Sequence, residues 1–176
     1  GGSTYPASVQ TAGGTGLSVC PGGRKVGASP AAAKDSTACT YGGGLDWAAL
    51  TGMATKTISS GATLNGLAPS VSAGVCNTGS GTNWGDPLHT DPLMATCQSY
   101  FPIIYAQGDL HVSGGVGQGI LLVEGDLSVT GGMAFYGPVI VKGSLSSAGT
   151  GGHFYGGVMA ANVDLSQNTL LGNGVV

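Results

Sequence analysis

The stretch that decides the fold of this chain is ILLVEGDLSVTGGMAFYG, residues 120–137. It begins with apolar residues, passes a Gly-Asp turn, alternates apolar with polar residues, and ends in glycines and aromatics. Altered copies follow one another without a gap, at 102–119, 120–137, 138–156 and 157–174. A phrase that returns every 18 or 19 residues is typical of a repeat architecture. Each coil of a solenoid stacks on the one before, so the same residue type must return at the same place.

Alternation with a period of two predicts β-strands whose alternate side chains point inward. Glycines 108, 125 and 143 mark a corner, where we expect a positive φ. The sequence thus predicts a mainly β fold, a short right-handed parallel β-helix of about four coils. The predicted inward residues are Ile104, Ala106, Leu110 and Val112; Leu121, Val123, Leu127 and Val129; Val139, Val141 and Leu145; and Ala161, Val163 and Leu165.

One outward column of the predicted solenoid is apolar. It contains Tyr105, Leu122, Ile140 and Ala160, with Ile103, Ile120, Pro138 and Val158 beside it. An apolar outward face must be covered, either by a helix of the same chain or by a partner protein. On the second interpretation the docking surface consists of Ile103, Tyr105, Ile120, Leu122 and Ile140.

The first part of the chain, 1–101, differs in character from the repeats and predicts a separate Gly/Ala-rich lobe. The segment LDWAALTGMATKTI at 45–58 predicts one helix, since apolar residues recur there at three- and four-residue steps and Asp46 can cap its start. Domain organisation is therefore expected as an irregular lobe at 1–101 and a parallel β-helix at 102–176.

The four cysteines all lie in the first 97 residues and match no zinc-binding spacing. An even number predicts two disulfides, which indicates an oxidising, extracytoplasmic compartment, the periplasm or the cell surface. Three connectivities are open. We favour Cys20–Cys39 with Cys76–Cys97, because each then closes a loop of about 20 residues, worth on the order of 3 kcal/mol.

Composition excludes several classes of protein. The chain has 176 residues, 35 of them glycine, with 7% charged residues and a net charge of −3. Five Lys and Arg residues supply no basic stripe for nucleic acid. No run approaches eighteen apolar residues, so we expect no membrane span.

Few residues suggest chemistry. Asp109 and Asp126 fall one coil apart and are weak candidates for a calcium site or an acid/base pair, although Asp after Gly is also ordinary turn chemistry. In NWGDPLHTD, Asp86 and His89 are weak metal candidates beside a rigid Asp-Pro turn. We expect no metal, no cofactor and no catalytic residue. The pairs Phe135-Tyr136 and Phe154-Tyr155 predict an aromatic stack, with a sugar-binding stripe as the alternative.

The runs NWGDP (83–87), YFPIIYAQGDL (100–110), GQGILLVEGDL (117–127) and GGHFYGGVMAANVDL (151–165) carry a resemblance. Together they resemble the Gly-rich β-helical ectodomains of bacterial PilX-like, pilin-related envelope proteins, over about 76–176. A more distant likeness is to bactofilin-type β-helical polymers. The resemblance implies an N-terminal prepilin-type helix and a β-helical head outside the membrane, and no activity is attached to its motifs.

The sequence accordingly favours a non-catalytic structural or docking protein of the bacterial cell envelope, such as a pilin-like surface component, whose partners are other envelope proteins. Two alternatives stay open. One is an extrinsic subunit that stabilises an integral photosynthetic, respiratory or secretory membrane complex. The other is a β-helical module that binds or cleaves carbohydrate.

Overall fold

The computed structural model describes residues 18–19, 25–26 and 46–164, with side chains from 46 to 161. The chain divides into two compact units, Gly1–Met53 and Ala54–Val176, and each is described by itself. In the first unit, two-residue strands β1 (Ser18–Val19) and β2 (Lys25–Val26) pair antiparallel. The expected Cys20–Cys39 bridge lies outside the described residues.

The predicted helix is real but shorter than expected. Helix α1 (Trp47–Gly52) begins at Asp46, whose carboxylate accepts a hydrogen bond from the Ala49 N–H at 2.8 Å, so the predicted cap is confirmed. The predicted extension to 58 is wrong, because Lys56–Ile58 forms strand β3. β-Branched Thr57 and Ile58 suit a strand, and pairing with a later strand satisfies their backbone groups. None of the α1 residues is buried.

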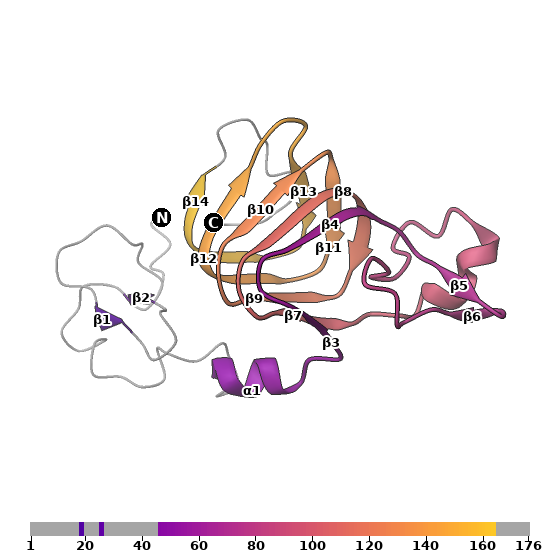
Figure 1. Ribbon diagram of the computed structural model, residues 1–176, viewed down its shortest axis with the longest axis horizontal. Coiled ribbons are helices and arrows are strands. Elements are labelled where there is room, and N and C mark those ends of the chain that lie inside the picture. The colour runs from indigo at the N-terminus through magenta and orange to yellow at the C-terminus, as the bar shows by residue number, and fades with distance from the viewer. Residues whose placement is uncertain (1–17, 20–24, 27–45, 165–176) are drawn as a thin grey trace, which may run out of the picture. The chain divides into compact units, whose positions relative to one another are not determined.

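The second unit is a parallel β-solenoid, which confirms the predicted fold class (Figure 1). Its strands form three parallel stacks. The first stack contains β3 (Lys56–Ile58), β7 (Ile103–Ala106), β9 (Ile120–Val123) and the starts of β12 (Val139–Ser147) and β14 (Val158–Asp164). The second contains β4 (Ala62–Leu67), the start of β8 (Leu110–Gln118), β10 (Leu127–Thr130) and the ends of β12 and β14. The third contains the end of β8, β11 (Met133–Tyr136) and β13 (Gly152–Tyr155).

The core lies inside these stacks, where equivalent residues of successive coils meet. Ile104 pairs with Leu121 and Leu121 with Val139, while Leu110 pairs with Leu127 and Leu127 with Leu145. The eleven inward residues predicted for the first three copies are all buried, and all belong to one apolar cluster. Alternation located them correctly because a strand has one inward and one outward side.

The fourth copy has a different register from the predicted one. Val158 and Ala160 pair with the inward residues Val139 and Val141, so Val158 lies in the core and not in the outward column. Met159, not Ala160, continues that column by pairing with Ile140. The register then shifts between Val141 and Ser144, which leaves the predicted inward Ala161 outside the ladder of pairs. The physical reason is that the fourth copy is one residue shorter at this corner, with two steps from Ala160 to Asn162 against three from Val141 to Ser144, and a slip of one residue exchanges the two faces of a strand. Leu165 lies outside the described residues.

The solenoid also begins earlier than predicted. Strands β3 and β4 form a coil before residue 102, so the expected boundary at 101/102 falls inside the second unit. Between β4 and β7 the chain makes a loop region, residues 68–101, which we call the cap. It contains the antiparallel hairpin of β5 (Val71–Ser72) and β6 (Val75–Cys76), and the 3-10 helix η4 (Pro92–Cys97).

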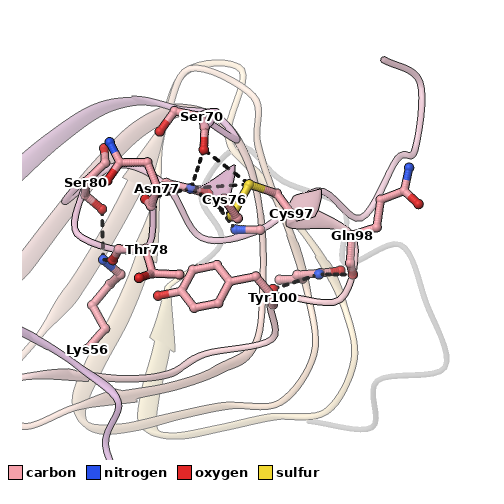
Figure 2. The surroundings of a disulfide bond; sticks show 12 residues. Lys56, Ser70, Cys76, Asn77, Thr78, Ser80, Cys97, Gln98 and Tyr100 are labelled. Carbon is pink, nitrogen blue, oxygen red and sulfur yellow. Dashed lines mark hydrogen bonds between the residues drawn. A yellow bond between two sulfur atoms is a disulfide. The ribbon is translucent and has the colours of Figure 1, made fainter. Parts of the chain in front are cut away.

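The predicted Cys76–Cys97 disulfide is present and joins this hairpin to η4, with 4.9 Å between the two Cα atoms (Figure 2). It closes the segment of the cap that runs from Cys76 to Cys97. The other proposed bridge is not among the described residues.

Candidate functional site

The two aspartates of the Gly-Asp turns hold one coil on the next. Asp109 Oδ1 accepts a hydrogen bond from the Asp126 N–H at 2.9 Å, and Asp126 Oδ1 accepts one from the Ser144 N–H at 2.7 Å. Each carboxylate thus satisfies a backbone donor at the corner of the following coil. The arrangement is turn chemistry repeated in register, and both side chains are exposed.

The glycine before each turn makes room for that carboxylate. A Cβ on Gly125 would lie 2.1 Å from Asp109 Oδ1, and a Cβ on Gly143 would lie 2.2 Å from Asp126 Oδ1. Gly108 faces Ser60 in the same manner, at 2.1 Å from its Oγ. None of the three has a positive φ, so the predicted reason for these glycines is wrong. They are needed for close approach of one coil to another.

The second predicted polar cluster lies in the cap. Asp86 is 4% exposed, and its Oδ1 accepts a hydrogen bond from the His89 N–H at 3.2 Å. The His89 side chain is exposed, and Asp91 accepts a hydrogen bond from the Leu93 N–H at the start of η4. Within the part of the chain that the structure describes, no group of three His, Cys, Asp or Glu side chains is placed to share a metal ion.

The cap is attached to the solenoid in part by a lysine that the sequence did not single out. Lys56 pairs in register with the inward Ile104, and its Nζ donates to the carbonyl oxygens of Thr78 and Ser80 at 2.9 and 2.8 Å (Figure 2). Burial lowers the pKa of the Lys56 ammonium. The sequence predicts position 56 in a helix, so its place in a strand and its role as an anchor are visible only with the loop that receives it.

Asn83 holds the cap together from within, whereas Gln118 and Trp84 attach it to the solenoid. Asn83 Nδ2 donates to the carbonyl oxygens of Ser70 and Asn77, at 3.1 and 2.9 Å. Gln118 Nε2, at the end of β8, donates to the carbonyl oxygens of Gln98 and Tyr100, both at 2.9 Å. The third, Trp84, is treated next.

Trp84 closes the core at the cap. It is fully buried, its Nε1 donates to the Gly81 carbonyl at 3.0 Å, and its ring meets the edge of Phe135 at 5.9 Å between centroids. Gly117 lies directly against it, because a Cβ there would stand 2.9 Å from the Trp84 Cβ. The next two coils have Phe135 and Phe154 in register with Gly117. The Trp84 side chain therefore fills, beside this glycine, the space that a phenylalanine ring fills in those coils.

The predicted docking surface is placed on the outward side of the first stack. Tyr105, Leu122 and Ile140 follow one another in register there, and Ile103 pairs with Ile120 beside them. Leu122 is fully buried and Ile140 is 9% exposed, whereas Ile103, Tyr105 and Ile120 are half-buried. The column ends at Met159, which is 44% exposed.

A polar group borders this column. The Tyr105 hydroxyl donates to Glu124 Oε2 at 3.1 Å, and Glu124 Oε1 forms an ion pair with the Lys142 ammonium. Burial raises the pKa of the Tyr105 phenol, and the adjacent Glu124 carboxylate raises it further. The phenol is therefore held neutral while it donates to the carboxylate.

The predicted aromatic stack is confirmed on the third stack of strands. Tyr136 and Tyr155 pair in register with their rings parallel, 4.3 Å between centroids, while Phe135 and Phe154 point into the core. Because the two tyrosine rings face each other, their faces are used within the chain, and sugar stacking would be limited to the outer side of Tyr155. His153 precedes this pair, and His111 lies on the outward side of the second stack beside Ser128.

Comparison with known proteins adds no family name. No family model, no curated protein and no solved structure matches the chain. Among the described residues, no helix has the length and apolar character needed to cross a membrane.

Proposed function

We propose that this chain is a non-catalytic docking protein that works outside the bacterial cytoplasm and presents a rigid β-solenoid to another protein. The carrying observation is the contrast between two outward faces of one fold. The outward side of the second stack is polar, with Thr63, His111, Ser128 and Ser146 in register. An outward face in water is expected to look like that.

The first stack breaks this rule. Its outward side carries Tyr105, Leu122, Ile140 and Met159 in register, with Ile103 and Ile120 alongside. The Tyr105–Glu124–Lys142 group gives this apolar strip a polar border, which is the composition of a protein interface with an apolar centre and a polar rim. The surface offered to a partner is Ile103, Tyr105, Ile120 and Met159, since Leu122 and Ile140 are already buried.

Two settings fit a docking protein of this kind. One is a pilin-like surface component of the envelope, as the sequence resemblance implies. The other is an extrinsic subunit held by protein contacts on a membrane complex. The Cys76–Cys97 disulfide supports an oxidising compartment for either.

The carbohydrate alternative is less well supported by the same geometry. One oxygen of each corner aspartate accepts a backbone hydrogen bond, and the paired tyrosine rings stack on each other. These groups already have structural roles.

The docking proposal is tested by site-specific photo-crosslinking in cells that make the protein naturally. A photoreactive residue replaces Met159, at the end of the apolar column, or Thr63, which is exposed on the polar face. We expect position 159 to crosslink to one defined envelope protein and position 63 to give none. Equal labelling from both positions, or none from position 159, would contradict the proposal.

The compartment is tested separately, by trapping thiols in intact cells with a maleimide before lysis. We expect Cys76 and Cys97 to be unlabelled until a reductant is added. Labelling of both cysteines without reductant would place the protein in a reducing compartment.

A further inference from the structure

The cap contains two Asp-Pro peptide bonds, Asp86–Pro87 and Asp91–Pro92, within ten residues of η4 and the disulfide. An Asp-Pro peptide bond is especially open to cleavage by attack of the aspartate's own side chain, for two chemical reasons. The carboxyl oxygen can reach the residue's own carbonyl carbon through a five-membered ring, and the proline nitrogen is a tertiary amide nitrogen that leaves as a secondary amine. The structure places the two aspartates in different environments.

Asp86 is held with one carboxyl oxygen unused. Its Oδ1 accepts from the His89 N–H at 3.2 Å and its own N–H donates to the Cys97 carbonyl at 3.1 Å. Its Oδ2 is buried and has no hydrogen-bond partner in the described part of the chain. A buried carboxyl oxygen without a partner is uncommon in folded proteins and calls for an explanation.

The backbone around Asp86 is also constrained. Gly85 has a φ of +88°, and a Cβ there would lie 2.3 Å from the Tyr100 carbonyl oxygen. His89 has a φ of +53°, a left-handed conformation that is unfavourable for a residue with a side chain. Opening the chain between these two positions would release that constraint.

Asp91 provides an internal comparison. It is exposed, and its Oδ1 accepts from the Leu93 N–H at 2.9 Å as the cap of η4, with Pro92 inside the helix. Its carboxylate thus has a partner and free access to water, and its peptide bond is part of a regular element. The same dipeptide therefore occurs once in a constrained, buried setting and once in an ordinary one.

We propose that the chain cleaves its own backbone between Asp86 and Pro87. Asp86 Oδ2 attacks the Asp86 carbonyl carbon, the bond from that carbon to the Pro87 nitrogen breaks, and the carboxyl proton passes to the nitrogen. The product is a cyclic anhydride at Asp86 and a new amino terminus at Pro87. Water then opens the anhydride to two carboxyl groups, so the net reaction consumes one water molecule and needs no cofactor or oxidant.

The position of the bond gives the reaction a defined outcome. It lies between Cys76 and Cys97, so the disulfide keeps the two pieces covalently joined. The new terminus precedes a segment that carries the exposed Leu88 and Leu93, at 47% and 78% exposure. Cleavage would free one end of that apolar segment while the solenoid and its core remain as they are.

The experiment uses the purified full chain, kept in mildly acidic buffer and sampled over days. Intact mass, measured without reductant, should rise by one water molecule with time. Gels should show one band without reductant and two bands with it, and sequencing of the new terminus should read Pro-Leu-His. The rate should not change with protein concentration, because the step is intramolecular. A chain that stays intact throughout, or a rate that rises with protein concentration, would overturn the proposal.

Three variants identify the group responsible. Asp86→Ala removes the attacking carboxyl group and should abolish cleavage, while Asp91→Ala is the matched control and should cleave as the natural chain does. Pro87→Ala keeps Asp86 and removes the favourable leaving group, so it should slow cleavage and leave the thermal unfolding curve unchanged. If Asp86→Ala fails to fold, the Pro87→Ala variant still tests which bond is cleaved. Cleavage after residue 91 in place of 86, or undiminished cleavage in both Asp86→Ala and Pro87→Ala, would overturn the assignment.

Discussion

At the scale of single residues, the Gly-Asp pair explains the repeated phrase of this chain. The glycine admits the carboxylate of the preceding coil, and the aspartate sends its own carboxylate to the next. In the third copy the residue after Gly143 is serine, whose N–H donates the last hydrogen bond of the series to Asp126 Oδ1. Glycine and aspartate therefore recur together because each contacts a neighbouring coil, and not only because they form a local turn.

Gly143→Ala should destabilise the protein. The added methyl group would lie 2.2 Å from Asp126 Oδ1 and 2.6 Å from the Gly125 carbonyl oxygen, so backbone must move to admit it. We expect a loss of about 1–3 kcal/mol in the free energy of unfolding, the usual cost of overpacking. Denaturant unfolding followed by circular dichroism measures it.

Gly157→Ala is the matched control for that variant. A Cβ on Gly157 meets nothing within 4 Å and its φ is not positive. We expect a change below about 0.5 kcal/mol, the usual range for a surface substitution. If the two variants unfold at the same denaturant concentration, close approach is not the reason for glycine at position 143.

At the scale of elements, the cap is the most unusual part of the solenoid. It interrupts the coil between β4 and β7, yet Trp84 returns to the core and its carbonyl accepts the Gln118 N–H at 2.8 Å. The insertion therefore supplies part of the coil that it interrupts. Its own secondary structure is two short strands and one 3-10 helix, so its shape depends on the disulfide and on side-chain bonds to backbone carbonyls.

Replacing Cys76 and Cys97 together by serine should lower stability by about 2–4 kcal/mol, because the bridge closes a 21-residue separation in the unfolded chain. Both cysteines are changed so that no lone thiol remains. Thermal and denaturant unfolding measure the loss. An unchanged unfolding midpoint would show that Lys56, Asn83 and Trp84 hold the cap without the covalent link.

At the scale of the whole molecule, charged residues are few, and several phenol and ammonium groups that titrate at high pH are partly buried. Burial is the largest cause of the raised pKa values of Tyr100, Tyr105 and Tyr136, and for Tyr105 the nearby Glu124 adds to it. A phenol whose pKa is higher in the folded than in the unfolded chain keeps its proton longer when folded.

Stability should therefore fall as the pH rises above about 10, where the unfolded phenols ionise and the folded ones do not. Lys56 acts in the opposite sense, because its pKa is lowered by burial and its contribution improves with rising pH. Among the described residues, the three phenols with raised pKa values oppose this one ammonium. Denaturant unfolding at neutral pH and above pH 10 measures it.

Tyr105→Phe serves as the control for the alkaline prediction, since it removes one of the three raised phenols. This variant should lose less stability between neutral and alkaline pH than the natural chain does. An equal or greater loss would contradict the role given to Tyr105.

A solenoid is also expected to be unequally stable along its axis, because each coil contacts only its neighbours. Backbone amides of β9, β10 and the start of β12 have parallel strands on both sides, whereas within the described part of the chain β3 has a strand partner on one side only. We expect hydrogen exchange to be slowest in the former and faster in β3. Equal protection in β3 and β9 would indicate that the second unit unfolds as a single cooperative block.

The sequence by itself determined the solenoid, its repeat length and the inward residues of the first three copies, and it favoured the Cys76–Cys97 bridge among three open connectivities. The first three follow from local periodicity, and the bridge was favoured because it closes a short loop, so none of them needs knowledge of distant contacts. Only the tertiary structure decided where the first coil begins, the register of the fourth copy, the reason for the corner glycines and the roles of Lys56, Trp84 and Gln118. Each of these depends on which residue of another coil or loop lies opposite, and a single extra residue exchanges the inward and outward faces of a strand.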